Sequence, residues 1–181
     1  MRQLALLRAV NVAGHGTVKM EDVRDAFAAA GAGEVRTFIQ SGNVLFHAPR
    51  EAAFRHRVAE RLSRMLGEEP VVIYRSRRQV EELVRESPFG ELEDRRDRKL
   101  FVAFLARRPR RPPALPLRSE REAVEAIGIR ASDVFVVSWQ KKKGGMFGFP
   151  NALVERELDV PATSRNWNTV RRILALLREE R

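Results

Sequence analysis

The strongest constraint on the fold is the order in which strand-like and helix-like patterns follow one another in residues 1–75. Continuous or alternating apolar residues predict strands, and apolar residues repeated every three or four positions predict helices. The patterns come in the order strand, helix, strand, strand, helix, strand, which is the split motif of ferredoxin-like folds. The expected strands are 2–10, 35–40, 44–47 and 71–74, and the expected helices are 20–30 and 54–66.

The rest of the chain predicts a smaller subdomain that follows the ferredoxin-like part. Apolar runs at 100–106 and 134–139 predict two strands that extend or abut the first sheet. A charged connector, 89–98, separates them from the first part. The sequence therefore predicts an α+β fold with a ferredoxin-like subdomain, 1–87, and a second α+β subdomain, 88–181, which ends in a C-terminal helix.

Capping residues and apolar spacing predict three or four helices in this second part. Serine followed three residues later by glutamine or glutamate has the spacing of a capping box, in which each side chain bonds a backbone N–H of the other residue. We expect helices after Ser76 (with Gln79), after Ser119 (with Glu122, ending at Gly128), at residues 151–158, and after Thr163 or Ser164.

The composition excludes several classes of protein. The chain has no cysteine, which excludes disulfides, thiolate nucleophiles, iron–sulfur clusters and cysteine-bound zinc. No run approaches the roughly 18 apolar residues of a membrane span, and the apolar run in residues 1–8 is too short for a signal peptide. The three histidines lack metal-binding spacing, and no dinucleotide or Walker motif is present. We expect a cytoplasmic protein without metal or cofactor.

Positive charge is concentrated in two short stretches. The formal net charge is +10, and residues 99–118 and 141–150 together hold nine basic residues and no acidic ones. Loops with this charge suit a polyanion, although an arginine-rich composition also raises solubility without any ligand. The basic residues that would flank a ligand are Arg107, Arg108, Arg110 and Arg111 in a proline-rich linker, and Lys141, Lys142 and Lys143 in a turn.

Two polar loops are expected to meet at one edge of the first sheet. In a ferredoxin-like sheet the third strand pairs antiparallel with the first, so the hairpin tip at 40–43 lies beside the end of the first strand. The loop 11–16 leaves from the same end. Turn geometry alone also favours glycine and asparagine in such loops. The candidate ligand contacts are Arg8, Asn11, His15, Lys19, Gln40, Ser41 and Asn43.

A third polar segment lies at the expected start of the C-terminal helix. Trp167 begins the apolar stripe of this helix and is expected in the core. Arg165, Asn166 and Asn168 are expected either to bind an anion at the helix N-terminus or to tie the helix to the first subdomain through hydrogen bonds.

Three sequence blocks, taken together, resemble the bacterial domain-of-unknown-function family 1697. They are residues 5–14 (ALLRAVNVAG, followed by Lys19 and Met20), 36–44 (RTFIQSGNV) and 162–170 (ATSRNWNTV). The resemblance implies a cytosolic bacterial protein with a ferredoxin-like portion. It supplies no reaction and no catalytic residues, and the segment 140–149 departs from the pattern of the family.

The leading hypothesis is an anion-recognising module that binds nucleic acid or nucleotide through the converging loops. The strands lack the exposed aromatic pattern of RNA-recognition domains, so backbone contacts are expected instead. Two alternatives remain. One is an enzyme for a small phosphorylated or carboxylated metabolite, with His15 as acid or base. The other is a protein-interaction module that uses the arginine–proline linker.

Overall fold

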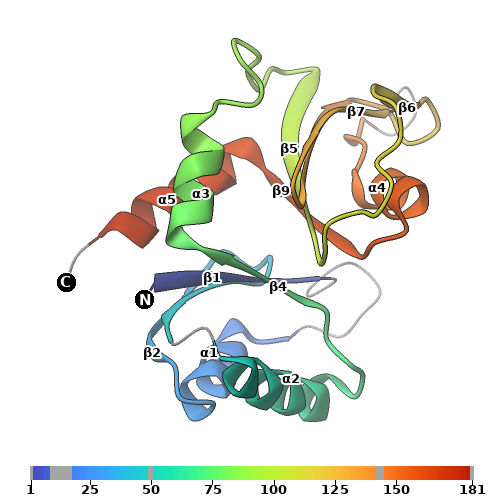
Figure 1. The fold of residues 1–181 in the computed structure, drawn as a ribbon. Coiled ribbons are helices and arrows are strands. Elements are labelled where there is room, and N and C mark those ends of the chain that lie inside the picture. The colour runs from blue at the N-terminus through green and yellow to red at the C-terminus, as the bar shows by residue number, and fades with distance from the viewer. Residues whose placement is uncertain (1, 9–17, 49–50, 142–144, 180–181) are drawn as a thin grey trace. The chain divides into compact units, whose positions relative to one another are not determined.

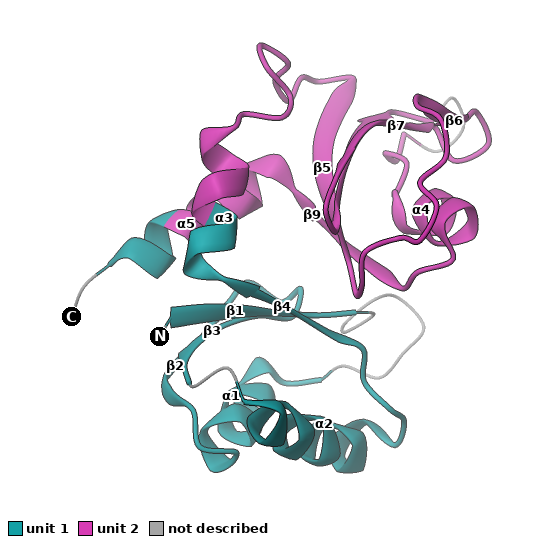
Figure 2. Cartoon of the chain, in the orientation of Figure 1, with its two compact units in different colours: residues 1–80, 175–181 teal, residues 81–174 magenta. Residues whose placement is uncertain are grey.

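A computed structural model of the chain describes residues 2–8, 18–48, 51–141 and 145–179 (Figure 1). These residues form five helices and two antiparallel sheets, which confirms the α+β class. The chain divides into unit 1, residues 1–80 with 175–181, and unit 2, residues 81–174 (Figure 2). The sequence-based boundary at 87/88 follows α3 (Arg77–Arg85), whereas the observed division falls inside that helix.

Unit 1 contains the six elements that the sequence predicts, in the predicted order. Its sheet has the strand order β2-β3-β1-β4, with every neighbouring pair antiparallel. Helix α2 ends at Gly67, which adopts a left-handed conformation with φ 74°. The elements are β1 (Arg2–Leu7), α1 (Met20–Ala29), β2 (Gly33–Phe38), β3 (Asn43–His47), α2 (Ala52–Leu66) and β4 (Val72–Ser76).

The core of unit 1 lies between one face of this sheet and helices α1 and α2, which lie together on that side (Figure 1). Phe46 of β3 packs against Phe27 of α1 and Phe54 of α2, with ring centres 5.2 and 5.4 Å apart. Because side chains alternate along a strand, Arg2 and Leu45 lie on the opposite face of the sheet. That face also carries His47 and Arg36, which pair with Arg2 and Leu45.

Unit 2 is built on the second sheet, whose strand order is β6-β7-β8-β5-β9. Helix α4 covers one face of this sheet, where Leu153, Val154 and Leu158 pack against apolar residues of β5, β7 and β8. The strands are β5 (Arg98–Leu105), β6 (Leu117–Ser119), β7 (Val124–Arg130), β8 (Asp133–Trp139) and β9 (Ala162–Asn166), and the remaining helices are α4 (Asn151–Leu158) and α5 (Trp167–Arg178).

One of the two capping boxes begins a helix, as predicted. The backbone N–H of Ser76 donates to Gln79 Oε1 at 2.8 Å, and the N–H of Gln79 donates to Ser76 Oγ at 3.2 Å. Helix α3 follows directly.

The helix expected after Ser119 is wrong. The N–H of Glu122 does donate to Ser119 Oγ at 3.3 Å, but the bond closes a turn between β6 and β7. Ala123 ends this turn with φ 55°. Val124 and Ala126 then alternate with Glu125, so the chain continues as a strand with its apolar side on the core.

The expected cap at Thr163 or Ser164 is also wrong, because both residues lie in β9. This strand pairs with β5, and α5 begins only at Trp167. The side chains of Thr163, Ser164 and Arg165 in β9 are buried and hydrogen-bonded; Ser164 Oγ, for example, lies 2.6 Å from Asn151 Oδ1. The second part of the chain therefore contains five described strands rather than two.

None of the helices in the described ranges combines the length and the apolar character that a bilayer crossing requires.

Candidate functional site

The hairpin tip lies beside the end of β1, as the sequence predicts. Leu6 pairs with Asn43, and the N–H of Leu7 donates to the Gly42 carbonyl at 2.8 Å. Arg8 follows directly, and its N–H donates to the Val71 carbonyl at 3.0 Å. Arg8 and the turn at 40–43 therefore share one edge of the first sheet.

Asn43 has a structural role in this turn. Its side chain is fully buried, and Nδ2 donates to the Phe38 carbonyl and to Ser41 Oγ, both at 2.9 Å. Gln40 is exposed on the same turn, and Lys19 is exposed where it precedes α1. Asn11 and His15 lie outside the described residues, so their predicted part in a site stays a prediction.

Two asparagines at the start of α5 bind one carboxylate of unit 2. Asn166 and Asn168 each donate through Nδ2 to Asp94 Oδ2, at 2.9 and 3.0 Å. The other oxygen of Asp94 accepts the N–H of Leu100 at 2.7 Å. These bonds tie the start of α5 to the connector before β5.

Arg165 lies inside unit 2. Its side chain is 6% exposed, and Nη1 donates to Thr163 Oγ1 and to the Ser164 carbonyl, both at 2.8 Å. Burial lowers the pKa of the guanidinium to about 10. Its guanidinium is therefore not accessible to a surface ligand, which needs an exposed cation.

The two basic stretches lie at opposite ends of β5. The lysine stretch lies near the start of the strand, because Gln140, which precedes Lys141, donates its N–H to the carbonyl of Asp97, the residue before β5. After β5 comes the arginine–proline segment, residues 106–116, whose first residue donates its N–H to the Pro161 carbonyl. Lys99 and Leu105 are about 20 Å apart along an extended strand. The stretches therefore form two separate surfaces, and Lys142 and Lys143 lie outside the described residues.

The arginine–proline segment forms one wall of a groove in unit 2. The groove has a volume of about 670 Å³. Its other wall is the turn between β7 and β8, at Ile129 and Ala131. The lining side chains of the segment are Arg108, Pro109, Arg110, Pro112, Pro113 and Leu115.

The arginines of this segment differ in their contacts. Arg107 donates to the Asp159 carbonyl at 2.8 Å and so anchors the start of the segment. Arg108, Arg110 and Arg111 are exposed, and they form no hydrogen bond or ion pair with any residue that the structure describes. Arg130, between the lining residues Ile129 and Ala131, is paired with Glu86. The groove is thus lined by the guanidinium groups of Arg108 and Arg110, and Arg111 lies beside them in the segment; none of the three charges is compensated by the described residues.

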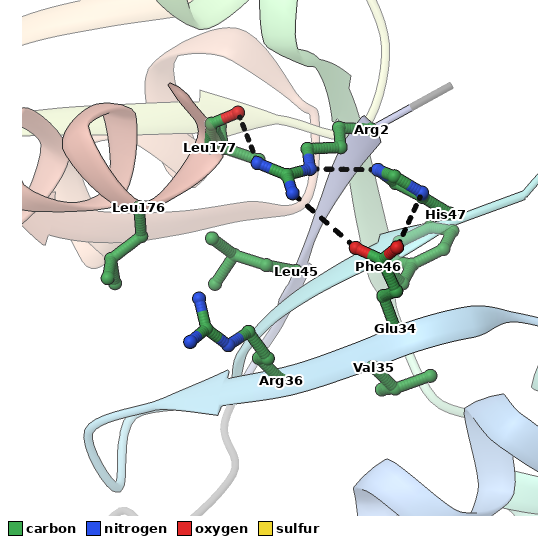
Figure 3. A pocket seen from close by; sticks show the side chains of 9 residues that line it. All are labelled: Arg2, Glu34, Val35, Arg36, Leu45, Phe46, His47, Leu176 and Leu177. Carbon is green, nitrogen blue, oxygen red and sulfur yellow. Dashed lines mark hydrogen bonds and ion pairs between the residues drawn. The ribbon is translucent and has the colours of Figure 1, made fainter. Parts of the chain in front are cut away.

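Unit 1 contains a smaller cavity that the sequence did not reveal. It has a volume of about 160 Å³ and lies between β1, β2, β3 and the end of α5 (Figure 3). Its polar groups come from Arg2, Glu34, Arg36 and His47, and Leu45, Leu176 and Leu177 supply much of its apolar surface. The sequence shows polar residues on the strands that line this cavity. It does not show that Leu176 and Leu177, from the far end of the chain, line the same cavity.

Neither hollow resembles a metal centre. Nowhere among the described residues do three histidine, aspartate or glutamate side chains come close enough together to hold a metal ion. Guanidinium groups are permanently charged donors, and they suit phosphate or carboxylate ligands.

Comparison with known proteins agrees with the fold and leaves the ligand open. The chain is similar in structure to a conserved bacterial protein of Streptococcus pneumoniae, with a TM-score of 0.63 and 18% sequence identity over 98% of each chain. At that identity the likeness supports the fold alone. No curated protein matches the sequence. The model of a protein family of unknown function, DUF1697, matches residues 1–135, and the chain belongs to this family.

Proposed function

We propose that this protein binds single-stranded nucleic acid, and that the arginine–proline groove of unit 2 holds the sugar–phosphate backbone. The observation that carries the proposal is a group of three exposed arginines that lack partners among the described residues: Arg108 and Arg110, which line the groove, and Arg111, which neighbours them in the segment. An unpaired guanidinium offers its donors and its full charge to a phosphate.

The proline content of the segment supports binding without a large entropic cost. Proline fixes φ, so the backbone between the arginines has few alternative conformations. The bond from Arg107 to Asp159 holds one end of the segment in place. A segment ordered before binding loses little conformational entropy when a ligand arrives.

The shape of the groove favours a single strand. Its volume is about 670 Å³, which is in the range of sites for small ligands and so leaves room for part of a single strand but not for a duplex. Apolar surfaces of Pro112, Pro113 and Ile129 line it, and they can cover bases while the arginines bind phosphates. Among the described residues no aromatic side chain lines the groove, so we expect little preference among bases.

The test is the binding of a fluorescent oligothymidylate or oligouridylate of about 20 nucleotides, followed over about 50 to 200 mM salt. The variant Arg108→Gln/Arg110→Gln/Arg111→Gln should bind at least tenfold more weakly at the lower salt. Its log–log salt slope should be shallower by about 2, since each lost phosphate contact on a single strand contributes about 0.7.

A matched control separates the groove from the net charge. Arg24→Gln/Arg61→Gln/Arg64→Gln removes the same charge from exposed positions on α1 and α2 of unit 1. This variant should bind less than twofold more weakly. Equal weakening by both variants, no binding by the natural protein, or equal binding of polyglutamate would overturn the proposal.

We also infer that residues 2–76 form a ferredoxin-like unit. We further infer that the protein works in the cytoplasm, where single-stranded nucleic acid is present. The strand order β2-β3-β1-β4, with two strand–helix–strand crossings, supports the fold. Fractionation of cells that produce the protein, with detection by antibody, tests the location.

A further inference from the structure

The cavity of unit 1 has an apolar floor with a guanidinium group on each side. In Figure 3 the side chain of Leu45 lies between those of Arg2 and Arg36. Leu45 is 5% exposed. The strand register sets its neighbours: Arg36 of β2 pairs with Leu45, and Arg2 of β1 pairs with His47, two residues farther along β3 on the same face. The arrangement is therefore fixed by the backbone of three strands.

Arg2 is held in place by three partners. Its Nε donates to His47 Nε2 at 2.8 Å, Nη1 donates to the Leu177 carbonyl at 3.3 Å, and Nη2 reaches Glu34 Oε2 at 3.4 Å (Figure 3). Because a guanidinium cannot accept a hydrogen bond, Nε2 of His47 is the acceptor in this contact. Arg2 is thus oriented and partly compensated before any ligand binds.

A β-bulge shapes the rim of the cavity. The pairing of β2 with β3 shifts register between Gly33 and Arg36, and Glu34 has φ 47°. A left-handed conformation at a non-glycine residue is uncommon and strained, and bulges and turns are among the places where it occurs. Here the bulge brings the Glu34 carboxylate to Arg2 and places Oε1 at 3.8 Å from His47 Nδ1.

Arg36 has a partner that can be displaced. Its Nη1 lies 2.9 Å from Glu179 Oε2, in the segment that follows α5. The Arg36 side chain is 39% exposed and that of Glu179 is 50% exposed. Exposed ion pairs contribute about 0 to 1 kcal/mol, so another carboxylate that also fills the cavity can take the place of Glu179.

We propose that this cavity binds a small monocarboxylate with an apolar body, and that Arg36 takes the carboxylate in exchange for Glu179. The apolar body would rest on Leu45 and Leu176. The cavity volume of about 160 Å³ is close to the ~150 Å³ of an engineered cavity that takes up benzene. A benzoate-sized ligand therefore fits, and a nucleotide does not.

This site is independent of the nucleic-acid proposal. Every residue that lines the cavity belongs to unit 1, and every residue that lines the groove belongs to unit 2. Failure of one proposal leaves the other unaffected.

The experiment titrates benzoate into the full chain with isotope-labelled leucine methyl groups and follows their NMR shifts. The shifts of Leu45 and Leu176 should move together and saturate in the millimolar range, as expected for a ligand of this size. Glu179→Gln should tighten binding by roughly two- to fivefold, because it removes the competing carboxylate. Arg36→Gln should weaken binding by about tenfold or more.

Two controls keep the outcome decisive. Arg24→Gln removes an exposed arginine of α1 that is likewise paired with a carboxylate, Asp25, and should leave the affinity unchanged. Benzyl alcohol has the same body without the charge and should bind at least tenfold more weakly. Equal binding of benzyl alcohol, an unchanged affinity in Glu179→Gln, or no shift of the leucine methyl groups would overturn the proposal.

Discussion

Gly148 lies where unit 2 leaves no room for a side chain. Its N–H donates to the Trp139 carbonyl at 3.1 Å, and its carbonyl accepts the Ser138 hydroxyl at 2.6 Å. A Cβ at this position would lie 2.7 Å from the Ala123 carbonyl oxygen and closer still to that of Glu122. Both obstacles are backbone atoms, so relief requires the turn between β6 and β7 to move.

We therefore expect Gly148→Ala to lower the free energy of unfolding by about 1–3 kcal/mol or more, the usual cost of overpacking. Urea denaturation followed by tryptophan fluorescence measures it, since both tryptophans lie in unit 2. Gly128→Ala, in the same unit, is the matched control, because a Cβ there meets only side-chain atoms of Phe135, the nearest at 2.9 Å, and a side chain shifts more easily than backbone. Equal midpoints for the two variants would contradict the expectation.

At the scale of elements, the β6–β7 turn is held by the carboxylate of Glu122. Arg156 of α4 donates to Glu122 Oε1 at 3.1 Å. A hydrogen bond from the Ser119 hydroxyl, and then the charge and hydrogen bond of Arg156, hold the pKa of this carboxyl below its ordinary value. The ionised form thus joins the turn to the helix.

The lowered pKa makes this link pH-dependent. The unfolded chain takes up the proton first, at about pH 4.3, so the stabilisation is complete above that pH and is lost as the pH falls through the lower folded pKa. Glu122→Gln should lower stability by about 1 kcal/mol at pH 7 and by less at acid pH. Urea midpoints of the variant and the natural protein across pH 7 to 3 measure this loss of stability. A stability difference that stayed constant with pH would contradict the expectation. Glu157→Gln serves as the control, because it removes a carboxylate that is bonded to the same arginine, Arg156.

The sequence predicted unit 1 well because its elements follow the ordinary periods of strands and helices. It failed at β7 because the Ser119–Glu122 pair carries the same local signal whether a helix or a turn follows. It failed at β9 because Thr163, Ser164 and Arg165 are polar, and only the partners of a folded unit make their burial acceptable.

The candidate sites were predictable in part. The basic character of the arginine–proline segment is plain in the sequence, but the groove needs Ile129 and Ala131, which only the sheet of unit 2 brings opposite it. The cavity of unit 1 joins Arg2 to Leu177. No local pattern links positions so far apart, so the fold has to be known before such a site can be found.

At the scale of the whole molecule, α5 contributes to both units. Residues 167–174 belong to unit 2, and the last turn, with the segment after it, belongs to unit 1. Leu174 and Leu177 are both buried, at 4% and 1% exposure. Replacing each of these two leucines by alanine therefore tests how the same helix stabilises each unit: Leu174 reports on unit 2 and Leu177 on unit 1.

We expect Leu177→Ala to destabilise unit 1, because Leu177 is buried there and its carbonyl accepts the bond from Arg2. Loss of a buried leucine costs about 2–5 kcal/mol, so amide hydrogen exchange in β1 and β3 should become at least about thirtyfold faster. Leu174→Ala, the matched control, should accelerate exchange in unit 2 first. Unchanged exchange in β1 and β3 of Leu177→Ala would mean that the end of α5 does not support unit 1, and the cavity would then lack a wall.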